Sequence, residues 1–200
     1  MSNLISMQSP LYQFNLAAKA AVADDSKNVW VYETPLLGYI SLRGNLQNAA
    51  FIAAVKDAIG VAIPAQPCTM EYASWGSILW LAPDEWLIVC ERAQRPELQA
   101  KLEHTLSEIH AQVVDNSGGF TSVVVQGRNA DEVLQHCTVY DLHKLSANKV
   151  VGSTFGKASV FLHRLDEGYC LIFRRSFADY IWRYLERSAL PYGFGITKQS

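Results

Sequence analysis

The chain has 200 residues, half of them apolar, and its formal net charge at pH 7 is −2. This length and composition fit one large domain or two fused half-domains with a packed core, and they exclude an intrinsically disordered protein. The basic residues are scattered along the sequence, so we expect no nucleic-acid partner, because such a partner requires clustered Lys and Arg.

The N-terminal segment and the cysteines indicate where the protein resides. The first 25 residues lack the basic start and continuous apolar core of a signal peptide, and the Ala-rich segment 16–23 is too short to cross a bilayer. We therefore expect no membrane association. The four cysteines show no Cys-x-x-Cys spacing, so we expect reduced, buried thiols and a cytoplasmic location.

The first half of the chain, residues 29–111, predicts one α+β module. Apolar alternation marks its strands, and a helical period of apolar residues marks its helices. The predicted elements are a strand at 38–42, a helix from the cap Asn45 to residue 59, hairpin strands at 78–81 and 86–89, and a helix at 96–110.

The second half, residues 112–190, predicts the same elements in the same order. The predicted elements are a strand at 122–125, a helix at 130–136 after a turn and cap at 126–129, hairpin strands at 160–162 and 169–173, and a helix at 177–187.

A single offset relates the two halves. Pairs of like residues lie 83 positions apart in strand, helix and hairpin, namely Gly44 and Gly127, Phe51 and Leu134, Trp86 and Tyr169, Leu98 and Ile181, and Leu102 and Leu185. One offset held across so many elements indicates a duplication. We therefore expect two pseudo-repeated βαββα (ferredoxin-like) modules, each covering the other's open sheet face. An N-terminal arm (1–28) and a C-terminal tail (191–200) flank them and either wrap the domain or dock on a partner.

Asp84 and Glu85 form an adjacent acidic pair between Trp80 and Trp86. One interpretation is a pair of carboxylates whose pKa values are pushed apart in an aromatic pocket. We favour a hairpin turn, because Pro-Asp is typical of turns and the matching segment 166–168 has the same character. The two tryptophans then anchor the strands on either side.

Asp141 and His143 are the best candidates for metal ligands, since a two-residue spacing places both side chains on one face of a strand. Only two ligands are visible, so we favour a structural histidine and expect no metal. The sequence has no Gly-x-Ser-x-Gly elbow and no glycine-rich loop between a strand and a helix. We therefore expect no catalytic and no cofactor-binding residue in this chain.

Arg174 and Arg175 precede the last predicted helix, whose N-terminal amides could help them to hold an anion. A solvated turn is the other interpretation. Because the arm, the aromatic tail and the tryptophan-rich core suggest binding surfaces, Arg174, Arg175, Trp80 and Trp86 are candidates for an interface or an anion contact.

Several stretches resemble a known family. Residues 114–119 and 125–130 are similar to the Asp-x-Ser strand and the Gly-x-x-Ala helix start of aminomethyltransferase-like (glycine-cleavage T-protein) folds. A narrower resemblance, to the gamma subunit of heterotetrameric sarcosine oxidase, is carried by residues 42–44, 79–87, 141–143 and 175–182.

This resemblance implies a subunit of an enzyme that demethylates sarcosine to glycine with O2, yielding H2O2 and 5,10-methylenetetrahydrofolate. It also implies alpha, beta and delta partner subunits that carry FAD, FMN, NAD, tetrahydrofolate and zinc. The gamma chain itself is expected to be a non-catalytic scaffold without a cofactor.

Two alternatives stay open. The first is a stand-alone folate-binding or folate-dependent protein of the same fold. Against it, segment 156–160 has no acid where folate-using relatives carry a carboxylate, and Arg174 and Arg175 replace an asparagine-bearing turn. The second is an anion-responsive regulatory module built on these two arginines.

Overall fold

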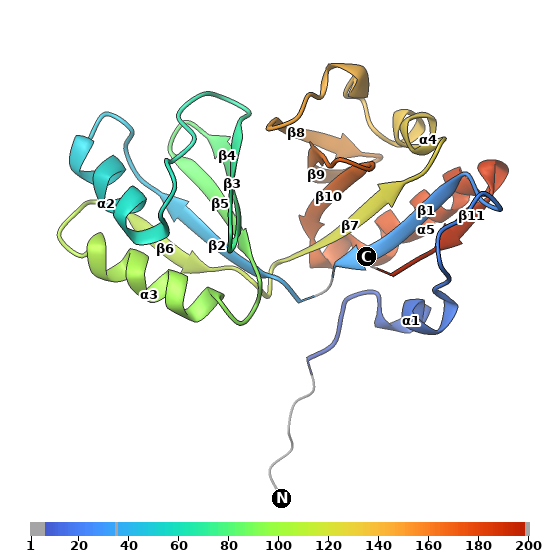
Figure 1. Cartoon of the computed structure of the whole chain (residues 1–200), viewed down its shortest axis with the longest axis horizontal. Helices are drawn as coiled ribbons and strands as arrows, with labels where there is room; N and C mark the ends of the chain where they lie inside the picture. Colours follow the sequence, from blue (N-terminus) through green and yellow to red (C-terminus); the bar gives the residue numbers. More distant parts are fainter. Residues whose placement is uncertain (1–6, 35, 199–200) are drawn as a thin grey trace, which may run out of the picture.

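The computed structural model describes residues 7–34 and 36–198. Figure 1 shows two β-sheets that face each other, with α2 and α3 on the outer side of one sheet and α4 and α5 on the outer side of the other. The predicted α+β fold with two sheets is therefore confirmed.

The first sheet has five antiparallel strands and is covered by two helices. Its strand order is β3 (Met70–Ala73), β4 (Gly76–Ala82), β5 (Glu85–Cys90), β2 (Gly38–Arg43) and β6 (Gln112–Asp115). Helices α2 (Ala49–Ile59) and α3 (Arg95–Thr105) pack on its outer face.

The second sheet has six strands, of which only the pair of β11 and β1 is parallel. Its strand order is β11 (Phe194–Ile196), β1 (Val29–Thr34), β7 (Phe120–Gln126), β10 (Tyr169–Arg174), β9 (Ala158–Arg164) and β8 (Val150–Phe155). Helices α4 (Ala130–Cys137) and α5 (Ala178–Ala189) cover its outer face.

The two halves exchange their first strands. β1 pairs antiparallel with β7 in the second sheet, and β6 pairs antiparallel with β2 in the first. The exchange was not predicted, because β1 and β6 were not among the predicted strands and apolar alternation does not reveal which strands pair. Each repeat also contains an edge strand, β3 or β8, that was not predicted from the sequence.

The start of α2 corrects the predicted cap. The helix begins at Ala49, and its cap is Asn48, whose side-chain oxygen accepts a hydrogen bond from the Ala50 amide at 3.0 Å. Asn45 accepts from the Gln47 amide at 2.8 Å and thus stabilises the preceding turn. Both asparagines are good cap residues, so the local sequence alone could not choose between them. The other predicted helix of this half, at 96–110, differs at its C-terminal end: α3 ends at Thr105.

The inner faces of the two sheets share a hydrophobic cluster. Tyr39 and Leu87 from the first sheet meet Phe120, Val124 and Ile172 from the second. The Tyr39 and Phe120 rings lie 5.6 Å apart between centroids. The predicted packing of two open sheet faces against each other is therefore confirmed.

The described part of the arm wraps the second module. Leu11 is 1% exposed in the core, and the Phe14 ring lies 5.8 Å from Trp182 of α5. The arm contains two short helices, η1 (Tyr12–Phe14) and α1 (Leu16–Lys19). The tail adds β11 beside β1, so the described parts of the arm and of the tail both pack on the second module.

Candidate functional site

The two candidate tryptophans lie opposite each other in the β4–β5 hairpin. Trp86 is fully buried, donates from its indole nitrogen to the Pro64 carbonyl at 2.8 Å, and packs 5.8 Å from the Phe51 ring. Trp80 is half-buried at the edge of the same core. Trp86 is therefore a core residue, whereas Trp80 keeps a surface that another molecule can reach.

Asp84 and Glu85 lie at the turn of this hairpin, as predicted. Arg43 approaches both carboxylates, at 3.5 Å and 3.6 Å, and the Gly44 amide donates to the Asp84 carbonyl at 3.1 Å. Such solvent-exposed ion pairs contribute little stability. The acidic pair is thus part of a turn and not of a carboxylate pocket.

Arg174 ends β10 in the second sheet and Arg175 follows it directly, whereas both tryptophans lie in the first sheet. The Arg174 guanidinium lies 4.3 Å from the centre of the Phe120 ring. Arg175 begins the short helix η3 (Arg175–Phe177) and donates to the Gln8 carbonyl of the arm at 2.9 Å. The structure therefore does not bring the four candidate residues together in one site.

The Asp141 and His143 pair does not lie on a strand. Asp141 caps the short helix η2 (Leu142–Lys144) by accepting a hydrogen bond from the His143 amide at 3.2 Å. The His143 ring instead contacts the Gln135 amide nitrogen at 3.0 Å. Within residues 7–34 and 36–198, no three His, Cys, Asp or Glu side chains gather as a metal site would require.

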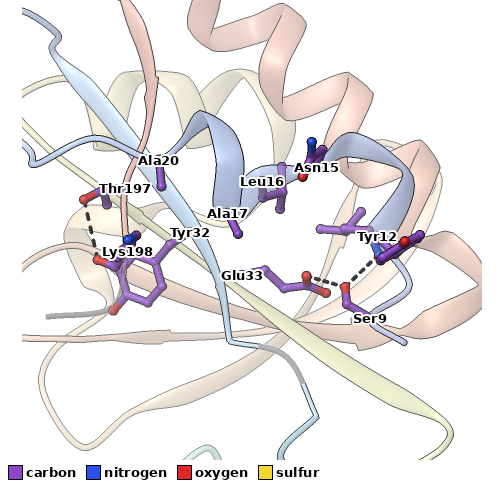
Figure 2. Close-up of a pocket in the computed structure, with 11 residues that line it drawn as sticks. Ser9, Tyr12, Asn15, Leu16, Ala17, Ala20, Tyr32, Glu33, Thr197 and Lys198 are labelled. Atoms are coloured by element: carbon purple, nitrogen blue, oxygen red, sulfur yellow. Dashed lines mark hydrogen bonds between the residues drawn. The ribbon is translucent and has the colours of Figure 1, made fainter. Parts of the chain in front are cut away.

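The arm encloses a cavity of about 440 Å³ that sequence analysis did not predict. Figure 2 shows Glu33 and Ser9 pointing toward each other beside Tyr12, with Tyr32 and Lys198 at the other end. Glu33 accepts hydrogen bonds from Ser9 and, at 3.2 Å, from Thr121. Burial raises the pKa of Glu33, and these two hydrogen bonds and the nearby Arg175 oppose the rise.

A signal for Glu33 was present in the sequence. In β1 the residues Val29 and Val31 are buried on the helix-covered face, and Glu33 follows in the same alternating phase. A carboxylate on the buried face of a strand requires hydrogen-bond donors, so we expect another segment of the chain to bind it. Here that segment is the arm.

A second cavity, of about 430 Å³, lies between the two sheets. His163, Cys170 and Ser122 line it from the second sheet, and Ser77 lines it from the first. Burial lowers the pKa of His163 to about 4 and raises the pKa of Cys170 to about 12. At neutral pH this cavity therefore contains an uncharged imidazole and a protonated thiol.

Comparisons with known proteins agree with this structure. A family model described as the sarcosine oxidase gamma subunit family matches residues 43–190. The sarcosine oxidase subunit gamma of Corynebacterium sp. (strain U-96) is 29% identical over 187 residues, which cover 89% of this chain and 87% of the relative. That of strain P-1 is 27% identical over 175 residues, covering 86% and 85%.

Solved structures give the same result. A chain of the heterotetrameric sarcosine oxidase from Corynebacterium sp. U-96, in complex with pyrrole 2-carboxylate, superposes with a TM-score of 0.83 at 25% identity, covering 93% of this chain and 96% of that chain. The glycine cleavage system aminomethyltransferase T from Bartonella henselae shares the fold, with a TM-score of 0.67 at 15% identity over 96% of this chain and 60% of that one. In the described residues, no helix is long and apolar enough to span a membrane. The chain belongs to the sarcosine oxidase gamma subunit family.

Proposed function

We propose that this chain is the gamma subunit of a heterotetrameric sarcosine oxidase and that it acts as a structural subunit without catalytic residues. The observation that carries the proposal is the end-to-end similarity to one chain of such an enzyme, which covers 93% of this chain and 96% of the other. A match over both chains supports the same place in the same kind of assembly.

The chemistry of the buried groups supports the non-catalytic part of this proposal. Burial raises the pKa of Cys90 to about 11 and of Cys170 to about 12, so both remain thiols at neutral pH and are poor nucleophiles. His163 stays uncharged there. Trp86 packs in the core, and Arg175 is bound to the arm. Trp86 therefore serves packing, and Arg175 serves the attachment of the arm.

In the proposed complex, sarcosine is demethylated oxidatively to glycine with O2, which yields H2O2 and 5,10-methylenetetrahydrofolate. FAD, FMN, NAD and tetrahydrofolate would bind to the alpha and beta subunits, and zinc to the delta subunit. Trp80 and Arg174, which keep accessible surface, are the residues that we propose for partner contacts. The four cysteines are in the thiol form, which supports a cytoplasmic location.

Affinity purification of the tagged chain from its native cells tests the proposal. We expect it to co-elute in fixed stoichiometry with a larger flavoprotein, and the complex to release H2O2 when sarcosine is added. The chain expressed alone should be colourless and inactive. Sarcosine turnover by the isolated chain, or a monodisperse chain with no partner in those cells, would contradict the proposal.

A further inference from the structure

Residues from both halves of the chain line the cavity between the two sheets. β1, β7, β9 and β10 contribute from the second sheet, and β3, β4, β5 and the β3–β4 turn contribute from the first. Its volume of about 430 Å³ lies within the range of small-molecule sites. The shared hydrophobic cluster beside it fixes the distance between the two walls.

Buried polar groups are concentrated at this cavity. Ser77, Ser122 and His163 are three of the seven buried polar residues in the described part of the chain. Ser122 is satisfied, since its hydroxyl accepts from the Tyr39 hydroxyl at 3.2 Å. Within residues 7–34 and 36–198, the Ser77 hydroxyl and the His163 Nε2 have no hydrogen-bond partner, and neither is among the fully buried polar atoms that lack one. Both atoms therefore keep accessible surface, where a bound molecule can supply the missing hydrogen bond.

The hydrogen bonding of His163 determines what it offers to that molecule. Its Nδ1 lies 3.4 Å from the Arg164 carbonyl, which can only accept. Nδ1 therefore carries the hydrogen, and Nε2 presents a lone pair. Since burial also keeps the ring neutral at pH 7, with a pKa of about 4, this nitrogen accepts a hydrogen bond from a donor.

The rest of the lining selects an uncharged ligand. Among the described lining residues, Glu91 is the only Asp, Glu, Lys or Arg, and it is exposed just after the end of β5. A charged molecule in the interior would therefore lack a counter-charge there. Tyr32, Tyr72 and Trp75 supply aromatic walls. Trp75 is held in place, because its indole nitrogen donates to the Ile59 carbonyl at 2.8 Å.

We propose that this cavity binds a small uncharged aromatic molecule that carries an N–H or O–H group, which donates a hydrogen bond to His163 Nε2. The aromatic ring lies among Tyr32, Tyr72 and Trp75. This site does not depend on the place of the chain in an oxidase, since every group that forms it belongs to this chain.

Benzamide, benzoate and benzamidinium test the proposal, because they share one ring and differ in charge. Each is titrated into the full chain, and nuclear magnetic resonance follows the backbone amides and the histidine ring nitrogens. We expect benzamide to bind in the millimolar range and to shift His163 Nε2 and the amides of β9 and β10. The two ions should bind at least roughly tenfold more weakly.

Two variants and a control locate the site. His163→Phe removes the acceptor, and we expect benzamide affinity to fall about tenfold while the fold is kept. Ser77→Leu narrows the cavity from the opposite sheet and should weaken binding as well. The exposed His110→Phe is the matched control and should bind as the wild type does. No shifts at about 10 mM benzamide, equal affinity for all three probes, or unchanged affinity in both cavity variants would overturn the proposal.

Discussion

At the scale of single residues, the duplication preserves a residue type even where its physical reason differs. Gly127 has φ +107°, a backbone conformation that strongly favours glycine. Its counterpart Gly44 is required for a different reason, because a Cβ there would lie 2.3 Å from the Phe51 ring. One turn is thus constrained by its backbone and the other by the helix that packs on it.

His163 makes the protein sensitive to acid. Its pKa is about 4 in the folded chain, against an ordinary value of 6.5. Between these values the unfolded chain binds a proton that the folded chain does not, so stability falls as the pH drops from about 6.5 to 4. This single group should cost roughly 3 kcal/mol of unfolding free energy over that interval.

Urea denaturation at several pH values, with His163→Phe beside the wild type, measures this effect. The variant has no ionisable group at this position, so the difference in stability between the two proteins should change by roughly 3 kcal/mol across the interval. His110→Phe is the control, because it removes an exposed histidine and should leave the pH dependence of stability close to that of the wild type. A constant difference between the variant and the wild type from pH 7 to pH 4 would rule out this origin of acid sensitivity.

At the scale of elements, the arm is a structural part of the second module. Leu11 is buried against β1 and α5, and Arg183 of α5 lies over the Phe14 ring at 5.2 Å. We therefore expect Leu11→Ala to lower the free energy of unfolding by about 3 kcal/mol, because it removes the contacts of a buried side chain and enlarges the cavity beside it. Thermal or urea unfolding measures the loss.

The same arm provides a matched control for this substitution. Val22 is 87% exposed, so Val22→Ala removes the same kind of apolar surface without leaving a cavity. Its effect should stay within about 0.5 kcal/mol. Equal and small effects of the two substitutions would show that the arm does not contribute to the stability of the second module.

Most helices and strands could be predicted from the sequence, but few of the contacts between them could. Helices and hairpins were found because apolar periodicity and turn residues are local, and the offset of 83 positions related the two halves. The strand exchange, the cap at Asn48 and the two cavities were not predicted. His163 becomes notable only when the two sheets face each other, because Ser77 of the first sheet lines the same cavity.

At the scale of the whole molecule, the exchanged strands and the joined edges tie the two halves together. β1 completes the sheet of the second half, and β6 completes that of the first. The edge strands β3 and β8 also meet at their starts, where Met70 donates to the Asn148 carbonyl and Val150 donates to the Cys68 carbonyl, both at 3.0 Å. Neither half contains all the strands of its own sheet.

We therefore expect fragments 1–110 and 111–200 to fold together but not separately. Alone, each would expose the inner face of its sheet and a first strand that has no partner. Mixed, they should form a one-to-one complex with the dispersed amide spectrum of the intact chain. Full-length protein cleaved at an introduced protease site between residues 110 and 111 is the control, because it separates the effect of the cut from that of the missing half. A dispersed spectrum from either fragment alone would mean that strand exchange is dispensable, and that each half closes its own sheet.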